Sequence, residues 1–324
     1  MPKGIIGLGI WCVDTAYLIK ELPNRGKLER ILESKKCVGG GPSNVLTNLH
    51  SMGFKYPKIA MGSLGNDENA NYIIKHCKNN QIETKYFVLS KKVPTSQSIC
   101  MIEKQKERTF FYQSGANELL DYKHFKINKL NLFPKILYVG YLTLLGKLDY
   151  FDKYNTRLCN ILFRARKRNM ITVVDLASNK DPSFQKVVFN SLRNIDYLLL
   201  NEVEAEYLFK KTIIGPKKRI NKKLVINFSK KLFLKGLKKA IVIHSQSESL
   251  YISSYEVIHT KSDTISKKNI INSVGAGDAF CAAFIYGLHE SLDMKITLKK
   301  AHSAGTNMLK IDSSSGNLAN IKKL

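Results

Sequence analysis

The chain has 324 residues, of which 44% are hydrophobic, so it can bury a large core and suits one α/β domain with a small appendage. No stretch reaches the apolar length of a membrane span, and the first residues lack a signal peptide's cleavage pattern, so we expect a cytoplasmic protein with no membrane partner. The formal net charge of +26 comes from 52 basic and 26 acidic residues, but the basic residues are spread along the chain, which argues against a nucleic-acid groove.

Apolar runs that predict strands alternate with segments of helical periodicity. We expect helices at residues 68–79, 149–169 and 224–237, between strands at residues 5–10, 58–61, 136–139, 172–175, 197–200 and 240–243. This alternation is typical of a mostly parallel sheet with helices on both faces. The sequence therefore predicts an α/β fold with a three-layer α/β/α core. No repeat or linker divides the chain, so we expect a single domain over residues 1–324.

Two segments, residues 12–38 and 95–112, break this alternation because they are rich in strand formers and carry no helical period. Within the second segment, residues 97–102 and 108–112 suit an antiparallel pair. The exposed face of this pair offers a surface for a homodimer.

A glycine-rich turn follows the first of these segments. Gly39, Gly40 and Gly41 lead through Pro42 into a segment of helical periodicity that stops at Gly53. By itself this turn is also compatible with an ordinary strand-to-helix loop. The same holds for Asp14, just after the first strand, which alone could equally be a turn residue.

Asn201 and Glu204 directly follow the predicted strand at residues 197–200. An Asn at a helix start with a Glu three residues later caps a helix in any protein, so the pair alone favours a local structural role. Ligands in open α/β sheets bind beyond the carboxyl ends of the strands, and the pair also lies where such a contact is expected.

The most informative stretch is residues 272–280, where Gly275, Ala276 and Gly277 form a Gly-Ala-Gly turn before Asp278 and an apolar helix. Such a turn brings backbone amides close to a ligand, and the helix presents its positive end to the same place. A carboxylate there is useful if its neighbour has a proton to give, so Asp278 fits a general base beside an anion hole. At this point an alternative stays open, in which Asp278 only caps the helix.

These motifs extend across almost the whole chain. In their order and spacing the sequence resembles the ribokinase-like, or PfkB, family of carbohydrate kinases. Residues 272–278 match the family's C-terminal signature, and residues 39–44 match its N-terminal Gly-Gly signature. Asn201 and Glu204 match its Asn-x-x-Glu motif, and residues 115–117 look like a further piece common in these kinases.

The resemblance implies ATP-dependent phosphorylation of a sugar hydroxyl. It also implies that residues 12–38 and 95–112 form a small β-sheet that acts as a lid over the sugar site. Asp278 would deprotonate the hydroxyl, and the amides of the Gly-Ala-Gly turn would stabilise charge on the transferred phosphoryl group. Asn201 and Glu204 would act on the Mg²⁺ of the nucleotide by ordering its water shell. The implied nucleotide contacts are Asn201, Ser245, Asn272, Gly277 and Asn307, and the implied acceptor contacts are Asp14, Gly39, Gly40, Asn44 and Asn117.

Two departures from the family pattern concern the nucleotide side. Asn272 and Ser273 stand where the family usually has Asp-Thr, and the lost negative charge argues against activation by a monovalent cation. Ser245 and Glu248 stand where relatives commonly have glycines, so the geometry of the adenine site is expected to differ.

The acceptor is the least defined part of the prediction. We favour a sugar because no aromatic cage for a base is legible, with a nucleoside as the alternative and an already phosphorylated sugar as a further one. Tyr112 and Tyr141 are additional pocket candidates, although each suits the core or the surface equally well. From another class, a non-catalytic nucleic-acid-binding protein on the same fold is the rival.

Two dense basic patches, residues 164–168 and 217–219, are explained most simply as solvated faces. The six cysteines show no close pairing, and several lie in apolar runs, so they favour a reducing cytosol over disulfides or metal sites.

Overall fold

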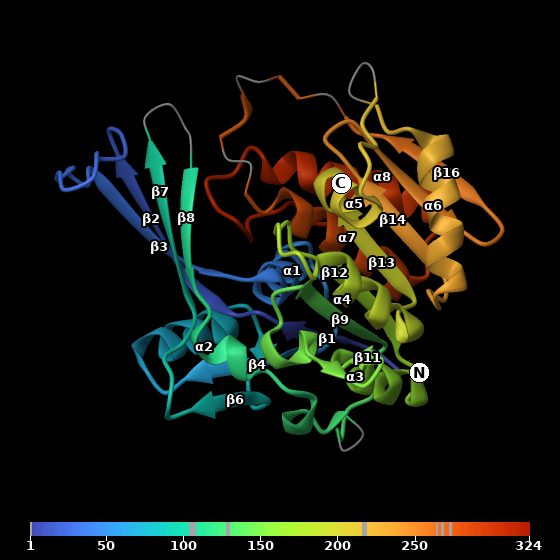
Figure 1. The fold of residues 1–324 in the computed structure, drawn as a ribbon, viewed down its shortest axis with the longest axis horizontal. Helices are drawn as coiled ribbons and strands as arrows, with labels where there is room; N and C mark the ends of the chain where they lie inside the picture. Colours follow the sequence, from blue (N-terminus) through green and yellow to red (C-terminus); the bar gives the residue numbers. More distant parts are fainter. Residues whose placement is uncertain are drawn as a thin grey trace.

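The computed structural model describes residues 2–103, 108–127, 130–215, 219–263, 265–266, 269–271 and 274–324. One large sheet with helices on both faces makes up most of the molecule, and a smaller sheet projects from one side (Figure 1). This arrangement confirms the predicted α/β fold with a mostly parallel sheet and a small second sheet.

The large sheet has its parallel strands at the centre and an antiparallel hairpin at one edge. From that edge inward its order is β16 (Val257–Lys261), β15 (Glu248–Ser253), β14 (Ala240–His244), β13 (Tyr197–Asn201), β12 (Ile171–Leu176), β9 (Ile136–Leu142), β1 (Ile5–Gly9), β4 (Lys58–Gly65) and β5 (Ile82–Glu83), and β6 (Phe87–Ser90) pairs with the end of β4. Only β14–β15 and β15–β16 are antiparallel among these pairs of the described chain. All six predicted strands are therefore present.

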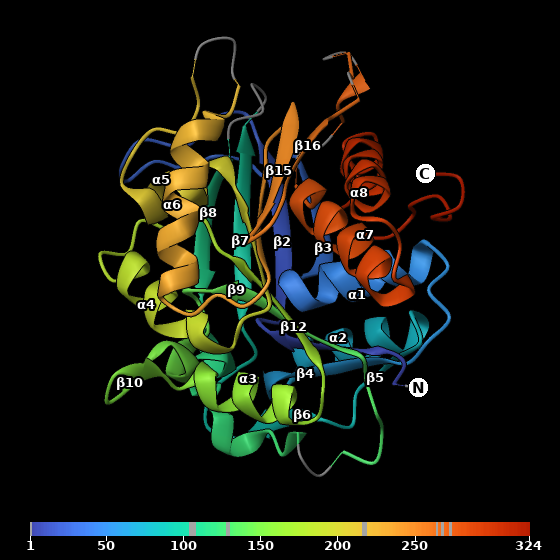
Figure 2. The same cartoon turned by 90° about the vertical axis from the view of Figure 1, so that its right-hand side faces the viewer.

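Helices cover both faces of this sheet (Figure 2). On one face lie α1 (Gly41–Ser51), α2 (Glu68–Asn79), α7 (Ala276–Glu290) and α8 (Met294–Met308), and on the other α3 (Leu158–Lys167), α4 (Phe184–Ser191), α5 (Glu202–Phe209) and α6 (Lys222–Leu234). Alternate residues of a strand point to opposite faces, so in β13 Leu198 and Leu200 join one core while Tyr197 and Leu199 join the other. Short 3-10 turns occupy Gly115–Leu119, Tyr122–His124, Gly146–Asp149 and Leu192–Asn194.

The small sheet, called the lid here, has the order β3 (Glu33–Gly39), β2 (Cys12–Ile19), β7 (Gln97–Glu103) and β8 (Arg108–Gln113). Its strands come from the two segments predicted to be strand-rich. The β2–β3 and β7–β8 pairs are antiparallel, whereas β2 and β7 run parallel. A parallel pair needs a long crossover connection, and the segment between β2 and β7 is long enough to provide it. The lid stands away from the core at the left of Figure 1.

The helix predicted at residues 149–169 is wrong over its first half. There a two-stranded hairpin, β10 (Phe151–Asp152) and β11 (Asn155–Thr156), precedes α3. Lys153 takes the left-handed φ of +61° that its tight turn requires, and the buried Thr156 hydroxyl lies 2.7 Å from the hydroxyl of Ser191. Tertiary contacts with α4 thus override a helical pattern in the sequence.

Other boundaries agree more closely. Helix α2 has the predicted bounds, because the Asp67 side chain caps it by accepting from the Ala70 amide at 2.9 Å. Helix α6 begins two residues before the prediction and ends three residues before it. Within the described chain, no helix combines the length and the apolar character that crossing a membrane would need.

Candidate active site

Polar side chains meet at the carboxyl ends of the parallel strands, where parallel βα units place their ligand sites. Strand β12 ends beside Asp175, β13 ends at Asn201, and β14 ends at His244. The N-terminus of α7 faces the same edge, and together they surround a hollow of about 380 Å³. The polar lining of this rim cavity includes Tyr141, Asp175, Asn201, Glu204, His244 and Asp278.

The Gly-Ala-Gly turn begins with a residue that must be glycine. Gly275 has a φ of +85°, and a Cβ atom added to it would lie 1.9 Å from the carbonyl oxygen of Ser314. Helix α7 starts at the next residue, so its unpaired amides and its positive end face the rim cavity. The turn therefore places backbone amides at the edge of the rim cavity.

Asp278 lies in the first turn of α7, and only 7% of it is exposed. Its Oδ2 atom accepts from Asn44 Nδ2 at 2.8 Å, and the Tyr141 hydroxyl donates to Oδ2 at 3.0 Å and Oδ1 at 3.2 Å. Burial raises the pKa of Asp278 to about 6; the bonds from Asn44 and Tyr141 oppose that rise, and the charge of Asp14 adds to it. A carboxylate with a pKa near neutrality suits a general base.

Asn44 joins the N-terminal glycine turn to Asp278. Gly40, with a φ of +95°, lets the chain enter α1 in contact with the backbone of Ile10, and Asn44 follows in the first turn. The Oδ1 atom of Asn44 is buried without a hydrogen-bond partner in the described part of the chain. A buried, unpaired acceptor is costly, and a hydroxyl donated by a ligand would satisfy it.

A second hollow, the lid cavity, has a volume of about 590 Å³ and lies between the lid and the loop at residues 312–314. Asp14 lines it, accepts from the Cys12 thiol at 3.3 Å, and has a pKa that burial raises. Gly39 packs against this carboxylate, because a Cβ atom there would lie 1.9 Å from Asp14 Oδ2. Ser314 lines the lid cavity and touches Gly275, so the two cavities adjoin at the Gly-Ala-Gly turn.

Asn117 is not brought to either cavity. It is fully buried, its Nδ2 donates to the Trp11 carbonyl at 3.2 Å and to the Tyr112 hydroxyl at 3.3 Å, and its Oδ1 accepts from the Trp11 amide at 3.5 Å. These bonds support the segment between β1 and β2. The placement favours a structural role over the predicted acceptor contact.

Asn201 and Glu204 form the capping box that their spacing predicts locally. Asn201 Oδ1 accepts from the Glu204 amide at 2.9 Å, and Glu204 Oε2 accepts from the Asn201 amide at 2.9 Å. Glu204 is nevertheless part of the rim cavity, where burial raises its pKa to about 7 and the charge of Asp278 adds to the rise. Capping and a site role are thus compatible in one pair.

Sequence reasoning missed Asp175, the residue that ties this site together. Its Oδ2 accepts from the Tyr138 hydroxyl at 2.6 Å, and its Oδ1 accepts from the Tyr141 amide at 2.8 Å. Burial and the neighbouring charge of Asp278 raise its pKa well above the usual range. The bond to its amide holds Tyr141 at a φ of +68°, with its hydroxyl on Asp278. The signal was available, since Asp175 ends a predicted strand.

The remaining predicted nucleotide contacts have local partners. The Ser245 hydroxyl donates to the Glu248 carbonyl at 3.1 Å within the β14–β15 turn, and Asn307 Nδ2 donates to the Ser303 carbonyl at 2.8 Å within α8. Asn272 lies outside the described residues. Glu248 itself is buried, where it accepts from the Ile220 amide at 2.6 Å, so its departure from glycine has a structural reason.

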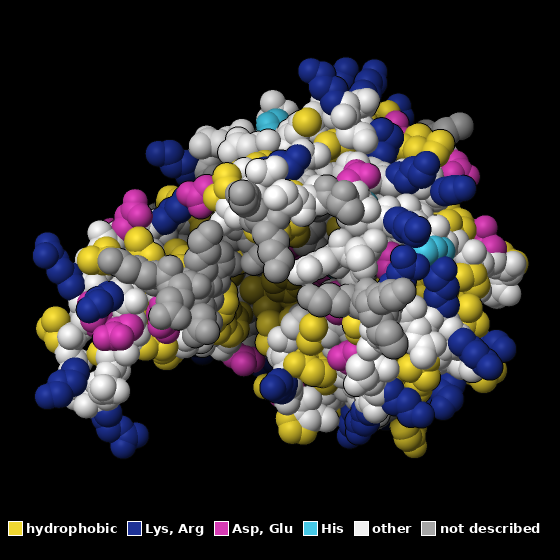
Figure 3. All heavy atoms as spheres, turned by 90° about the horizontal axis from the view of Figure 1, so that it is seen from above, with side chains coloured by type: hydrophobic (Ala, Val, Ile, Leu, Met, Phe, Trp, Pro, Cys, Tyr) yellow, Lys and Arg dark blue, Asp and Glu magenta, His cyan; other side chains and the backbone are white. Residues whose placement is uncertain are grey.

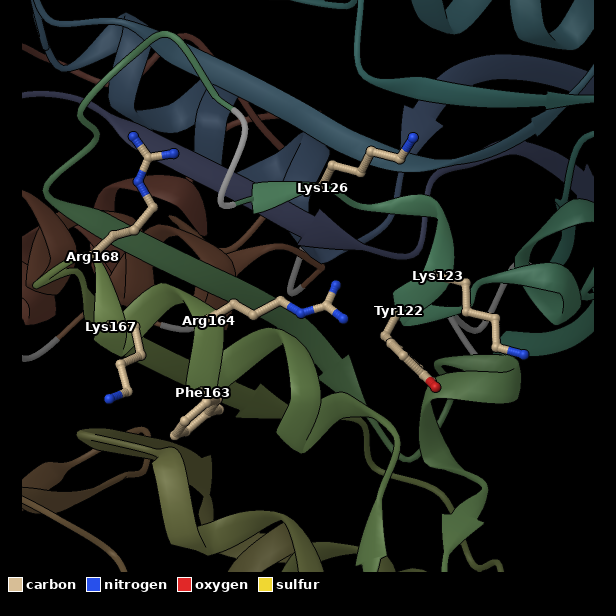
Figure 4. Close-up of a pocket in the computed structure, with 7 residues that line it drawn as sticks. All are labelled: Tyr122, Lys123, Lys126, Phe163, Arg164, Lys167 and Arg168. Carbon is tan, nitrogen blue, oxygen red and sulfur yellow. The ribbon is translucent and has the colours of Figure 1, made fainter.

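A third hollow, the basic hollow, shares no described lining residue with the rim cavity or the lid cavity, and Figure 4 shows the side chains that line it. It is lined by Tyr122, Lys123, Lys126, Phe163, Arg164, Lys167 and Arg168. Arg168 caps the C-terminal end of α3, shortly before β12 begins. The basic hollow therefore lies toward the amino ends of the strands, opposite the rim cavity. No predicted site residue lines it.

Comparison with known proteins places this geometry in a family. The model of the pfkB family of carbohydrate kinases matches residues 8–317. A ribokinase of Staphylococcus aureus (strain COL) is 22% identical over 297 residues, covering 90% of this chain and 88% of the relative.

Solved structures agree on the fold. The Arabidopsis thaliana ribokinase complexed with ribose and ATP superposes with a TM-score of 0.79 at 18% identity, covering 99% of this chain and 97% of that one. A Methanocaldococcus jannaschii nucleoside kinase of the ribokinase family gives a TM-score of 0.76 at 15% identity, with 99% and 96% covered. Since the family model spans nearly the whole sequence, this chain belongs to the pfkB family of carbohydrate kinases.

Proposed function

We propose that this chain transfers the γ-phosphoryl group of ATP to a hydroxyl group of a sugar or sugar derivative, with Asp278 as the general base. The observation that carries the proposal is the position of Asp278. It lines the rim cavity directly after the Gly-Ala-Gly turn, whose Gly275 touches Ser314 of the lid cavity, and it has a pKa near 6. A base in that position can serve an acceptor on one side and a phosphoryl group on the other.

The chemistry follows from this placement. Asp278 takes the proton of the acceptor hydroxyl as its oxygen forms a bond to the γ-phosphorus, and the bond from that phosphorus to the bridging oxygen breaks, so that ADP leaves with the electron pair. The amides of the Gly-Ala-Gly turn stabilise the charge on the transferred group. Asn44 and Tyr141 hold the carboxylate in line, and Asp14 and Asn44 bind acceptor hydroxyls.

The residues of the rim cavity fit a Mg²⁺ ion held through water. Asp175, Glu204 and Asp278 share the cavity, and neighbouring negative charge contributes to the raised pKa values of Asp175 and Glu204. Mg²⁺ gives up its water reluctantly and is usually held in proteins by one or two carboxylates together with substrate phosphates. When bound, such an ion neutralises phosphate charge, and Asn201 and Glu204 would orient its waters.

Further parts of the proposal concern setting rather than chemistry. Residues 1–324 form one kinase domain that includes the lid. The lid also offers a surface on which two copies of the chain would pair, since Phe111 on β8 is 55% exposed. All six cysteines are thiols, which suits the reducing cytoplasm. A nucleoside remains the alternative acceptor, in line with the nucleoside kinase that shares this fold.

The test compares wild type with Asp278→Asn for ATP-dependent phosphorylation of a panel of sugars and nucleosides. Loss of a positioned general base is expected to lower kcat by about 10²–10⁴-fold. Arg164→Ala, in the basic hollow, is the control and should retain wild-type turnover. Equal turnover in wild type and Asp278→Asn, with both folded by circular dichroism, would remove the kinase proposal. Steeply salt-dependent binding of DNA or RNA without turnover would favour the nucleic-acid-binding rival.

A further inference from the structure

The inner face of the lid is built from rows of side chains that cross its strands. Because residues two apart point to the same face, Asp14, Ala16 and Leu18 of β2 all line the lid cavity. The register places Asp14 beside Cys37 and Ser98, and the next row places Ala16 beside Lys35 and Cys100. The polar row therefore lies nearest the core. Farther out, the rows contain the apolar residues Ala16, Leu18 and Ile102 beside the exposed charged residues Lys35 and Glu33.

The apolar residues of these rows line a part of the lid cavity that a ligand carrying only hydroxyl groups would not require. Leu18 pairs with Ile102, and Phe110 of β8 lies beside Cys100. Across the cavity, Ile271 and Val274 are 56% and 36% exposed, so they present apolar surface to the same space. A ligand that fills the cavity beyond the row of Asp14 must carry an apolar face of its own.

The charge of this cavity opposes that of the whole chain. The chain has 52 basic and 26 acidic residues, yet the described lining contains the carboxylates of Asp14, Glu33, Glu103 and Asp312 and one cation, Lys35. Lys35 Nζ is 2.7 Å from Asp312 Oδ2, so these two charges compensate each other. Three carboxylates are then left without a cation among the described lining residues.

Figure 3 looks down on this part of the molecule. Hydrophobic side chains are visible inside the central hollow, whereas Lys and Arg side chains gather around the outer rim. On this face the Lys and Arg side chains thus lie mostly at the periphery, whereas the described lining of the lid cavity is apolar and acidic apart from Lys35.

From these observations we infer that the acceptor is an uncharged or amine-bearing polyol with an apolar face, and that the lid cavity discriminates against sugar phosphates and sugar acids. The inference rests on the proposed kinase function and narrows its acceptor. An anionic group in the cavity would meet Glu33, Glu103 and Asp14 without a free cation among the lining residues whose side chains are described, and like charges placed together are repelled. A hydroxyl or ammonium group would instead donate hydrogen bonds to the same carboxylates.

The experiment measures kcat/KM for acceptors that differ in charge. The probes are fructose with fructose 6-phosphate, glucose with glucosamine and gluconate, and the nucleosides adenosine and uridine. Neutral or amine-bearing acceptors should exceed their anionic counterparts by at least about tenfold, and the ratio should shrink as salt is raised. Adenosine and uridine should rank above fructose, because their bases present apolar faces to the lid cavity, and the reverse order would overturn the apolar part of the inference.

A double variant tests whether the lid carboxylates cause the discrimination. Glu33→Gln with Glu103→Gln should reduce the neutral-to-anionic ratio by about threefold or more. Asp152→Asn with Glu83→Gln removes two carboxylates outside the lid and should leave the ratio unchanged.

The outcomes separate the two proposals. Anionic acceptors used as well as neutral ones, or a ratio that the lid variant does not alter, would overturn the inference and leave the kinase function standing. Turnover of every probe no higher in wild type than in Asp278→Asn would overturn both.

Discussion

The rim cavity and the lid cavity meet at one glycine turn, yet they are built in different ways. The rim cavity is lined by residues at strand ends and helix starts, where local backbone chemistry sets their positions, as in the capping box of Asn201 and Glu204. The lid cavity is lined by alternate residues of strands that pair over long sequence distances. The comparison teaches that local motifs set where the backbone of the rim residues lies, whereas strand register sets which side chains line the lid cavity.

The strongest test of this difference is Gly275→Ala, which should disrupt the rim side. The new Cβ atom would collide with the Ser314 carbonyl and disfavour the φ of +85°, so the amides of the turn must move. We expect kcat to fall by roughly 10²–10³-fold, as when one oxyanion donor is lost. Gly26→Ala is the matched control, because Gly26 also has a positive φ, of +79°, but no atom lies within 4 Å of its added Cβ. Similar losses in both variants would mean that strain alone explains the effect.

The pH dependence of the reaction tests how Asp278 is held. The base must be ionised, so kcat/KM should fall as pH drops through about 6. Tyr141→Phe removes a hydrogen bond that lowers the pKa of Asp278, so this limb should move about one pH unit upward. Stopped-time assays between pH 5 and 8 measure it. An unmoved limb would show that Tyr141 does not support the carboxylate.

Asp278 should also make stability depend on pH. Its pKa in the folded protein is raised above the ordinary value, so the folded state binds the proton more tightly than the unfolded chain does. The stabilising contribution is therefore complete below pH about 4 and is lost as pH rises through about 6. The melting temperature of Asp278→Asn relative to that of wild type should accordingly be higher at pH 8 than at pH 4, and thermal melts at the two pH values measure this. A difference that grows toward acid would contradict the raised pKa.

Glu204→Gln separates capping from metal binding on the rim side. Glutamine can also close a capping box, so the free energy of unfolding should change by less than about 1 kcal/mol. The lost charge should raise the Mg²⁺ concentration for half-maximal activity by about tenfold. Titration of activity with Mg²⁺ at saturating ATP measures this. A change in stability without a change in Mg²⁺ dependence would leave only the capping role.

The smallest expected effect concerns the lid. Lys35→Ala breaks the ion pair that joins β3 to Asp312, but both side chains are largely exposed, so the melting temperature should hardly change. The acceptor KM should rise by about two- to fivefold, because the lid loses a contact with the opposite wall of its cavity. Lys36→Ala, which affects the next residue and a bond to Asn69, should leave KM unchanged. Equal acceptor KM values in wild type, Lys35→Ala and Lys36→Ala would show that the ion pair of Lys35 with Asp312 does not contribute to acceptor binding.

Several features of the fold and site were predictable because their signals are local. The boundaries of α2 follow from Asp67 and the apolar period after it, and Gly275 was identified because a tight turn before a helix requires glycine. The hairpin before α3 was missed because its strands depend on contacts with α4 and not on the intervening sequence. Asn117 was assigned to the acceptor because its motif was recognised, and its partner Trp11 is 106 residues away.

The sequence by itself determined the order of strands and helices, the glycine turns and the placement of Asn201 at a strand end and of Asp278 at a helix start, since backbone preferences act over a few residues. Asp14, expected just after the first strand, instead lies within β2 of the lid. Only the tertiary structure decided what those residues touch. The bond between Asn44 and Asp278 spans 234 positions, and that between Tyr141 and Asp278 spans 137. Such contacts, like the acidic and apolar rows under the lid, arise from how distant segments pack, and no periodicity within one segment encodes them.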